Sequence, residues 1–83
     1  MAELTSLLNI GKNMEKRLKL AGISTAEELR AAGSKEAFVR LKMQDPTVCV
    51  VYLYTLEGAI SGVEYNRLPE DVKQSLRDFS SEL

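Results

Sequence analysis

Two stretches of the chain, LNIGKNMEKRL at residues 8–18 and AGISTAEEL at residues 21–29, decide the expected fold. The first predicts a tight turn at Gly11 followed by a helix, because glycine adopts turn geometries without steric cost. Gly22 stands where helices commonly end, and Thr25 with Glu28 forms a capping box that starts the next helix. The pattern indicates a helix-hairpin-helix-like front half.

This hairpin raises a nucleic-acid hypothesis, because the N–H groups at a helix start can bind phosphate. Nearby lysines would add positive charge. The candidate nucleic-acid-binding residues are Asn9, Gly11, Lys12, Asn13, Lys16 and Lys19. The alternative is structural: Ile10 fills the core, and Gly11 only permits the turn.

The remaining sequence predicts further helices and a single all-α domain over residues 1–83. Asp45-Pro46 is a typical helix start, and the apolar run from Val48 continues to a stop at Gly62. A strand is the rival interpretation of this run, but no second strand-like segment is present to pair with it. We therefore expect a central buried helix there and a last helix opening at Leu68-Pro69.

The helix started by Thr25 is expected to end at Gly33, and a further helix from Ser34 is expected to turn Phe38, Leu41 and Ala37 inward. This gives about five short helices in all.

Composition and charge narrow the functional classes. The chain has 83 residues, no histidine and one cysteine, Cys49, which we expect to be buried core filler. Without histidine or a visible pocket, we expect no enzyme activity, no metal site and no cofactor. The longest apolar run, Val48 to Tyr54, is too short to span a membrane, and no signal peptide is visible, so we expect a cytoplasmic protein.

The charges are distributed unevenly. Residues 1–42 hold eight Lys or Arg against five Glu, and residues 43–83 hold three against seven acids. A basic front half favours the binding of phosphate groups, and an acidic rear half would repel them. Both halves also fit the alternative of ordinary solvated helix faces.

The tyrosines are candidates for protein contact, because tyrosine is enriched at interfaces. We expect Tyr52 to be a core residue with its hydroxyl near the surface. Tyr54 lies on another side of the same helix, and with Tyr65 it is a tentative protein-contact residue.

Much of the chain resembles the C-terminal domain of the TfoX competence regulators. The motifs that carry the resemblance are Asn9-Ile10-Gly11, Leu18, Ala21-Gly22-Ile23, Thr25, Glu27-Glu28-Leu29, Val48-Cys49, Leu53-Tyr54, Leu56-Glu57-Gly58-Ala59 and Leu68-Pro69. The front half alone is also similar to the C-terminal domain of the RNA polymerase α subunit.

The resemblance implies a compact all-α fold and a role in bacterial transcription regulation, with no catalytic residue to carry over. In the full regulators this domain follows an N-terminal domain, and they support induction of DNA-uptake genes together with the cyclic-AMP receptor protein. Since the chain begins at Met1, we expect a free-standing version of the domain. We expect a protein partner from the transcription machinery, with direct DNA binding as the alternative function and self-association as a further option.

Overall fold

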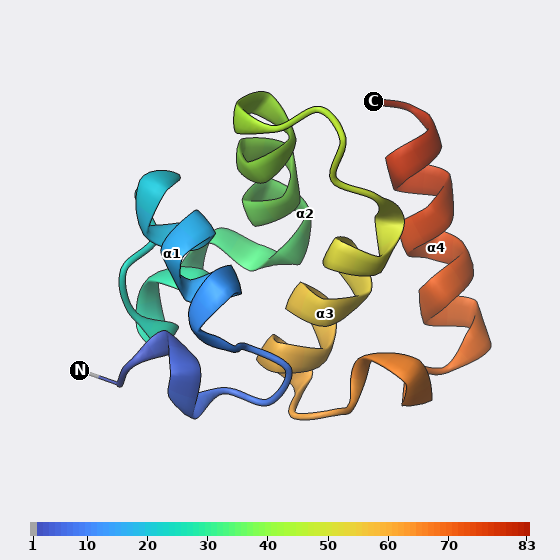
Figure 1. Cartoon of the computed structure of the whole chain (residues 1–83). Coiled ribbons are helices and arrows are strands. Elements are labelled where there is room, and N and C mark those ends of the chain that lie inside the picture. Colours follow the sequence, from blue (N-terminus) through green and yellow to red (C-terminus); the bar gives the residue numbers. More distant parts are fainter. Residues whose placement is uncertain (1) are drawn as a thin grey trace.

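The helix α3, Val50–Ser61, runs through the middle of the molecule, with α1 and α2 on one side and α4 on the other (Figure 1). The computed structural model describes residues 2–83, which contain four α-helices, two short 3-10 helices and no β-strand. The other elements are η1 (Leu4–Ser6), α1 (Lys12–Leu20), α2 (Ala26–Gln44), η2 (Tyr65–Arg67) and α4 (Glu70–Ser81).

The all-α prediction is confirmed, but the count of about five helices is wrong. The difference lies at Gly33, where we predicted one helix to end and another to begin. Gly33 has non-helical backbone angles, φ 85° and ψ 161°, yet the two helical parts run on as the single kinked helix α2. The predicted inward-facing residues after this kink, Ala37, Phe38 and Leu41, are all buried.

The predicted helix start at Asp45-Pro46 is also wrong, because Asp45 ends α2 instead of starting α3. Its N–H donates to the Leu41 carbonyl at 2.9 Å, and its carboxylate accepts from the Thr47 hydroxyl at 2.5 Å. α3 begins five residues after Asp45, at Val50. Cys49 therefore precedes the helix and is exposed, which corrects the expectation of a buried core cysteine.

The front half follows its local sequence signals closely. Gly22 has a φ of 85°, and the Ile23 N–H donates to the Leu18 carbonyl at 2.9 Å, which closes α1 in a Schellman arrangement. Thr25 Oγ1 accepts from the Glu28 N–H at 3.1 Å, and the Glu28 carboxylate accepts from the Ser24 N–H at 2.8 Å. The helix-hairpin-helix-like character of this half remains a prediction.

The core lies where α3 packs against α2 and α4, and the front elements close it from the other side. Its largest fully buried side chains are Leu4, Leu18, Ile23, Leu29, Phe38, Leu53 and Leu56. Within residues 2–83, no helix combines the length and apolar character needed to cross a membrane.

Candidate interaction site

Asn9 joins the hairpin to the far end of α3. Its φ of 73° is left-handed, a region that asparagine tolerates better than most residues. Its Nδ2 donates to the Val63 carbonyl at 3.1 Å, and its Oδ1 accepts from the Tyr65 N–H at 3.4 Å. The Asn9 side chain is therefore occupied with structural contacts, which distinguishes it from the other candidate nucleic-acid-binding residues.

Gly58 of α3 lies directly beneath this contact. A Cβ at Gly58 would overlap the Val63 carbonyl oxygen and lie 2.5 Å from Asn9 Nδ2. The partners that approach Gly58 are the Asn9 side chain of the hairpin and the backbone before η2. This contact fixes where α1 starts relative to α3.

The start of α1 is exposed and carries no side-chain cap. Gly11 is the N-cap residue, with φ −94° and ψ −179°, and no side chain hydrogen-bonds to the helix end there. Gly11, Lys12 and Asn13 are all exposed. The first N–H groups of α1 are consequently available to solvent or to a ligand.

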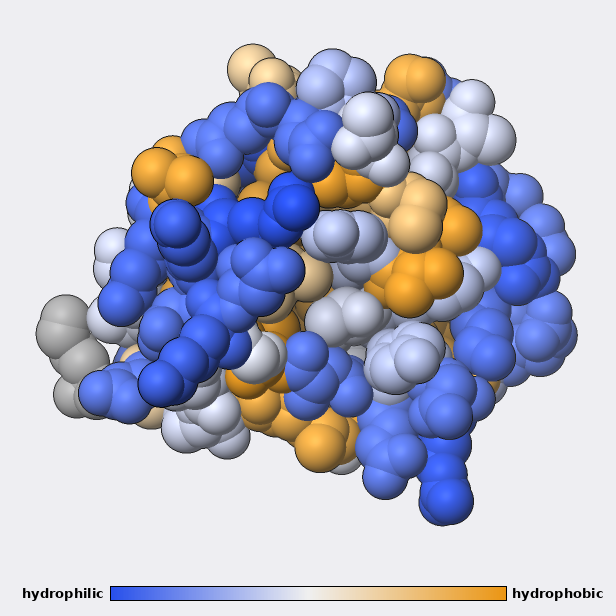
Figure 2. Space-filling view, viewed as in Figure 1, coloured by the Kyte–Doolittle hydropathy of each residue, from blue (hydrophilic) through white to orange (hydrophobic). Residues whose placement is uncertain are grey.

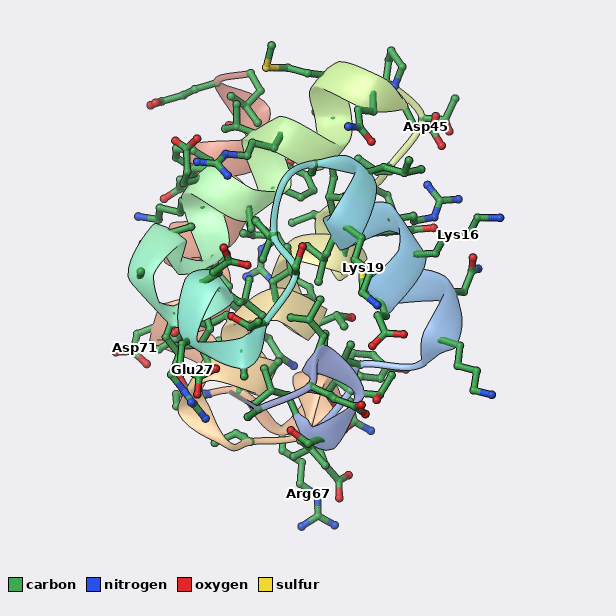
Figure 3. The ribbon with its side chains drawn as sticks, turned by 90° about the vertical axis from the view of Figure 1, so that its left-hand side faces the viewer. Lys16, Lys19, Glu27, Asp45, Arg67 and Asp71 are labelled. Atoms are coloured by element: carbon green, nitrogen blue, oxygen red, sulfur yellow. The ribbon has the colours of Figure 1, made fainter. Side chains whose placement is uncertain are left out.

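The predicted lysines share one face of α1. Lys12, Lys16 and Lys19 are spaced by four and three residues, which places them above one another on the helix. Lys16 and Lys19 point away from the body of the protein (Figure 3), and Lys19 Nζ lies 3.9 Å from the Glu15 carboxylate. With four basic residues against one glutamate, α1 carries a formal charge of +3.

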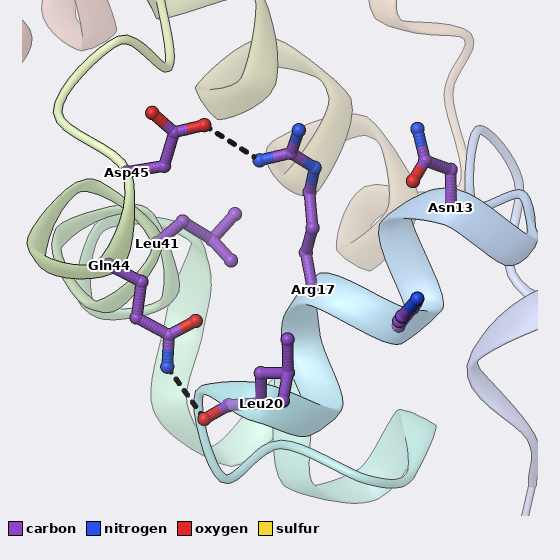
Figure 4. A pocket seen from close by; sticks show the side chains of 7 residues that line it. Asn13, Arg17, Leu20, Leu41, Gln44 and Asp45 are labelled. Carbon is purple, nitrogen blue, oxygen red and sulfur yellow. Dashed lines mark hydrogen bonds and ion pairs between the residues drawn. The ribbon is translucent and has the colours of Figure 1, made fainter.

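Arg17, which the sequence reasoning did not single out, links α1 to both neighbouring helices. Its guanidinium donates to Asp45 at 3.1 Å (Figure 4) and lies over the Tyr52 ring, 5.5 Å from the ring centre. Hydrogen bonds from the Thr47 hydroxyl and N–H, and then from Arg17, hold the pKa of Asp45 below its ordinary value. No local motif marks Arg17, because both of its partners lie far along the chain.

Arg17 separates two shallow grooves along α1. The α1/α3 groove has a volume of about 290 Å³ and is lined by Asn9, Gly11, Asn13, Met14, Arg17, Val51, Tyr52 and Thr55. The α1/α2 groove (Figure 4) is lined by Asn13, Lys16, Arg17, Leu20, Leu41, Gln44 and Asp45. No carboxylate lines the α1/α3 groove.

Val51 makes the α1/α3 groove partly apolar. It is 44% exposed although it is apolar, and the half-buried Tyr52 lies next to it on α3. In the view of Figure 1, Figure 2 shows neutral and apolar residues over α3 between the hydrophilic surfaces of α1 and α4. Singly exposed apolar residues are common, but this one lies in a groove beside a basic helix.

The two predicted protein-contact tyrosines lie outside this groove. Tyr54 is half-buried, and its hydroxyl accepts from Arg77 of α4 at 3.2 Å. This hydrogen bond joins α3 to α4. Tyr65 lies on η2 and is 43% exposed. The structure thus places them on different elements, and their role in partner contact stays a prediction.

The site offers binding groups but no assembled set of reactive groups. Across residues 2–83, no three Cys, Asp or Glu side chains come together as metal ligands. A groove of about 290 Å³ falls at the lower limit of small-molecule sites. The groove instead combines an apolar floor, exposed N–H groups and nearby basic side chains on a small all-α domain.

Comparison with known proteins identifies the family of this domain. The family model of the TfoX C-terminal domain matches residues 1–80, and the chain belongs to this family. It is similar to Protein Sxy of Escherichia coli (strain K12), with 34% identity over 80 residues that cover 96% of this chain. That match covers 38% of Sxy, so the chain spans well under half the length of this relative.

Two crystal structures of proteins from Listeria monocytogenes have the same fold. An uncharacterized protein in a triclinic form matches with a TM-score of 0.94 and 46% identity, covering 98% of this chain and 92% of that one. A protein of unknown function in a tetragonal form matches with a TM-score of 0.92 and 45% identity, covering 96% and 98%.

Proposed function

We propose that this domain is a non-enzymatic regulatory module that acts in bacterial transcription control by protein contact. Membership of the TfoX C-terminal family supports the regulatory role, which the resemblance links to the induction of DNA-uptake genes. The observation that carries the contact mode is the exposed apolar side chain of Val51 in the α1/α3 groove, beside the ring of Tyr52. The partner would be a protein of the transcription machinery.

A crosslinking experiment in the native cell tests the contact mode. A photoreactive amino acid is placed at Val51 in one strain and at Ser75, an exposed residue of α4, in another. We expect one transcription protein to be crosslinked from Val51 and not from Ser75. Equal capture from both positions, or none from Val51, would contradict the proposal.

Complementation tests the regulatory role itself. In a strain lacking the domain, the transcripts of DNA-uptake genes are measured after return of the wild-type, Val51→Asp or Ser75→Asp form. We expect the wild-type and Ser75→Asp forms to restore the transcripts and Val51→Asp to fail. Val51 lies in the first turn of α3, where an aspartate suits the helix dipole, so the variant should fold.

Direct DNA binding through the start of α1 is the second candidate function. The uncapped N-terminus of α1 beside the lysine face of Lys12, Lys16 and Lys19 favours it. We expect a binder of this kind to hold duplex DNA at low salt and to lose affinity steeply as salt rises, because it would contact phosphates.

The DNA titration uses fluorescent duplex DNA at low and at physiological salt. Lys12→Glu and Lys16→Glu should each weaken binding and reduce the salt slope by about one. Lys73→Glu on α4 is the charge-matched control and should leave the binding nearly unchanged. Absence of binding at low salt would reject this candidate.

A further inference from the structure

We propose that the α1/α3 groove binds an acidic segment of the partner protein that carries an aromatic or aliphatic anchor side chain. This inference rests on the proposed function and names the chemistry of its partner. The anchor would lie on Val51 and the edge of Tyr52, and the carboxylates would lie along the basic side of α1.

The floor of the groove fits one protein side chain better than a separate small molecule. Met14 of α1 and Val51 and Tyr52 of α3 supply its apolar part. Its volume of about 290 Å³ is just under the usual range of small-molecule sites. Shallow apolar grooves between helices are a common docking mode for peptide segments, in which a few anchors supply most of the affinity.

The charge around the groove is complementary to an acidic partner. α1 has a formal charge of +3, its exposed N-terminus adds partial positive charge, and no carboxylate lines the groove. The only charged residue of α3 is Glu57, whose carboxylate is occupied by Ser34 and Ser61. Arg17 is the one charged residue among those lining the groove, and the α1 lysines add longer-range attraction from beside it. Asp45, bound to Arg17, is the nearby carboxylate that an acidic segment would have to avoid.

Arg17 can hold a carboxylate of the partner without losing its internal role. Its bond to Asp45 uses one terminal nitrogen, and a guanidinium has five N–H donors in a fixed fork. The side chain is already held over Tyr52, so little conformational freedom would be lost on binding. The apolar lining of Met14, Val51 and Tyr52 suits a side-chain anchor and not a phosphate backbone, which favours an acidic peptide over DNA in this groove.

A displayed library of random peptides, selected on the intact purified chain, tests this chemistry. We expect the enriched peptides to combine Asp or Glu with Phe, Trp or Leu. In nuclear magnetic resonance titrations, one such peptide should shift the amide signals of Asn13, Arg17, Val51 and Tyr52. Matched peptides with Lys in place of the acids, and duplex DNA, serve as competing probes.

Variants separate the contribution of the groove floor at Val51 from that of the neighbouring basic face at Lys16. Val51→Asp should weaken the selected peptide about tenfold or more, as expected for loss of an apolar anchor. Lys16→Glu should weaken it about two- to fivefold, and Lys73→Glu should have no effect. Circular dichroism confirms that each variant is folded.

Several results would overturn the inference. These are failure to enrich any peptide class, enrichment of basic or neutral peptides, or signal shifts that map away from α1 and α3. Shifts of the same amides by DNA and not by acidic peptides would assign the groove to nucleic acid. If no acidic peptides are enriched while crosslinking from Val51 still captures a transcription protein, the acidic nature of the partner segment is refuted and the proposed protein contact stands.

Discussion

Replacing Gly58 by alanine places a methyl group where two other parts of the chain already lie. The added Cβ would overlap the Val63 carbonyl oxygen and lie 2.5 Å from Asn9 Nδ2. Neither neighbour can move cheaply, because one is backbone and the other is a short side chain held by two hydrogen bonds. The substitution should therefore force α3 away from the hairpin.

Three contributions set the size of the effect. Alanine is the better helix former, which would stabilise the protein by about 1 kcal/mol. Overpacking of a tight site costs about 1–3 kcal/mol, and loss of the Asn9 to Val63 hydrogen bond costs about 1 kcal/mol more. We expect Gly58→Ala to lower the free energy of unfolding by roughly 1–3 kcal/mol, and the Tm by roughly 4–20 °C.

Urea and thermal unfolding, followed by far-UV circular dichroism, measure this change. Gly11→Ala is the matched control, because nothing lies within 4 Å of a Cβ there; as an N-cap change it should cost less than about 1 kcal/mol. In an Asn9→Gly background, Gly58→Ala should cost less than in the wild type, with a coupling of about 0.5 kcal/mol or more. A Gly58→Ala protein more stable than wild type by about 1 kcal/mol would refute the reasoning.

Three further changes test other parts of the structure. Because the pKa of Asp45 is lowered in the folded state, its stabilising effect is present above the ordinary value of 3.8 and is lost as pH falls through the folded pKa. Asp45→Asn should thus reduce the acid-induced loss in the free energy of unfolding, measured by urea titration across pH; an unchanged acid slope would contradict this. Ser34→Ala removes a buried hydroxyl that donates to Glu57 at 2.6 Å and should cost about 1–2 kcal/mol in the same assay, whereas Ser61→Ala, at an exposed hydroxyl, should cost less than about 0.5 kcal/mol. Cys49 should react with a thiol reagent in the native protein at a rate near that of a free thiol, since it is exposed; reaction only after unfolding would show it to be buried.

Local backbone signals were enough to predict several features of the fold. Gly22 and Thr25 act through hydrogen bonds to residues within a few positions of themselves, so the sequence alone determines where α1 ends and α2 begins. The apolar run that forms α3 is confirmed as a central helix, because a lone strand would leave its backbone groups unsatisfied. One face of it is buried, whereas Val51 is exposed. In the first two cases the deciding hydrogen bonds join residues a few positions apart. In the third, the sequence contains no second strand-like segment that could pair with the run.

Features that depend on distant partners were missed. An Asp-Pro pair fits a helix start as well as a turn, and at Asp45 the turn is favoured by the ion pair with Arg17, 28 residues earlier. The left-handed backbone of Asn9 was within reach of sequence reasoning, but its bond to Val63 spans 54 residues. The α1/α3 groove is likewise invisible in the sequence, since its walls come from two helices separated by the whole of α2.

The position of Asn9 also decides how binding experiments should be interpreted. Asn9 was predicted to contact nucleic acid, yet its side chain ties the hairpin to the segment after α3 and so fixes where Gly11 and the start of α1 stand. Its replacement would disturb any ligand held by α1, whether DNA or peptide, without direct contact. An effect through folding should shrink when binding of Asn9→Gly is measured well below its unfolding temperature, because the native population is then restored. Loss of binding at Lys16→Glu should persist there, because that exposed side chain acts on the ligand and not on the fold. A loss at Asn9→Gly that persists in a folded protein, with the amide signals of Gly11 and Lys12 unchanged from the wild type, would return Asn9 to the binding surface.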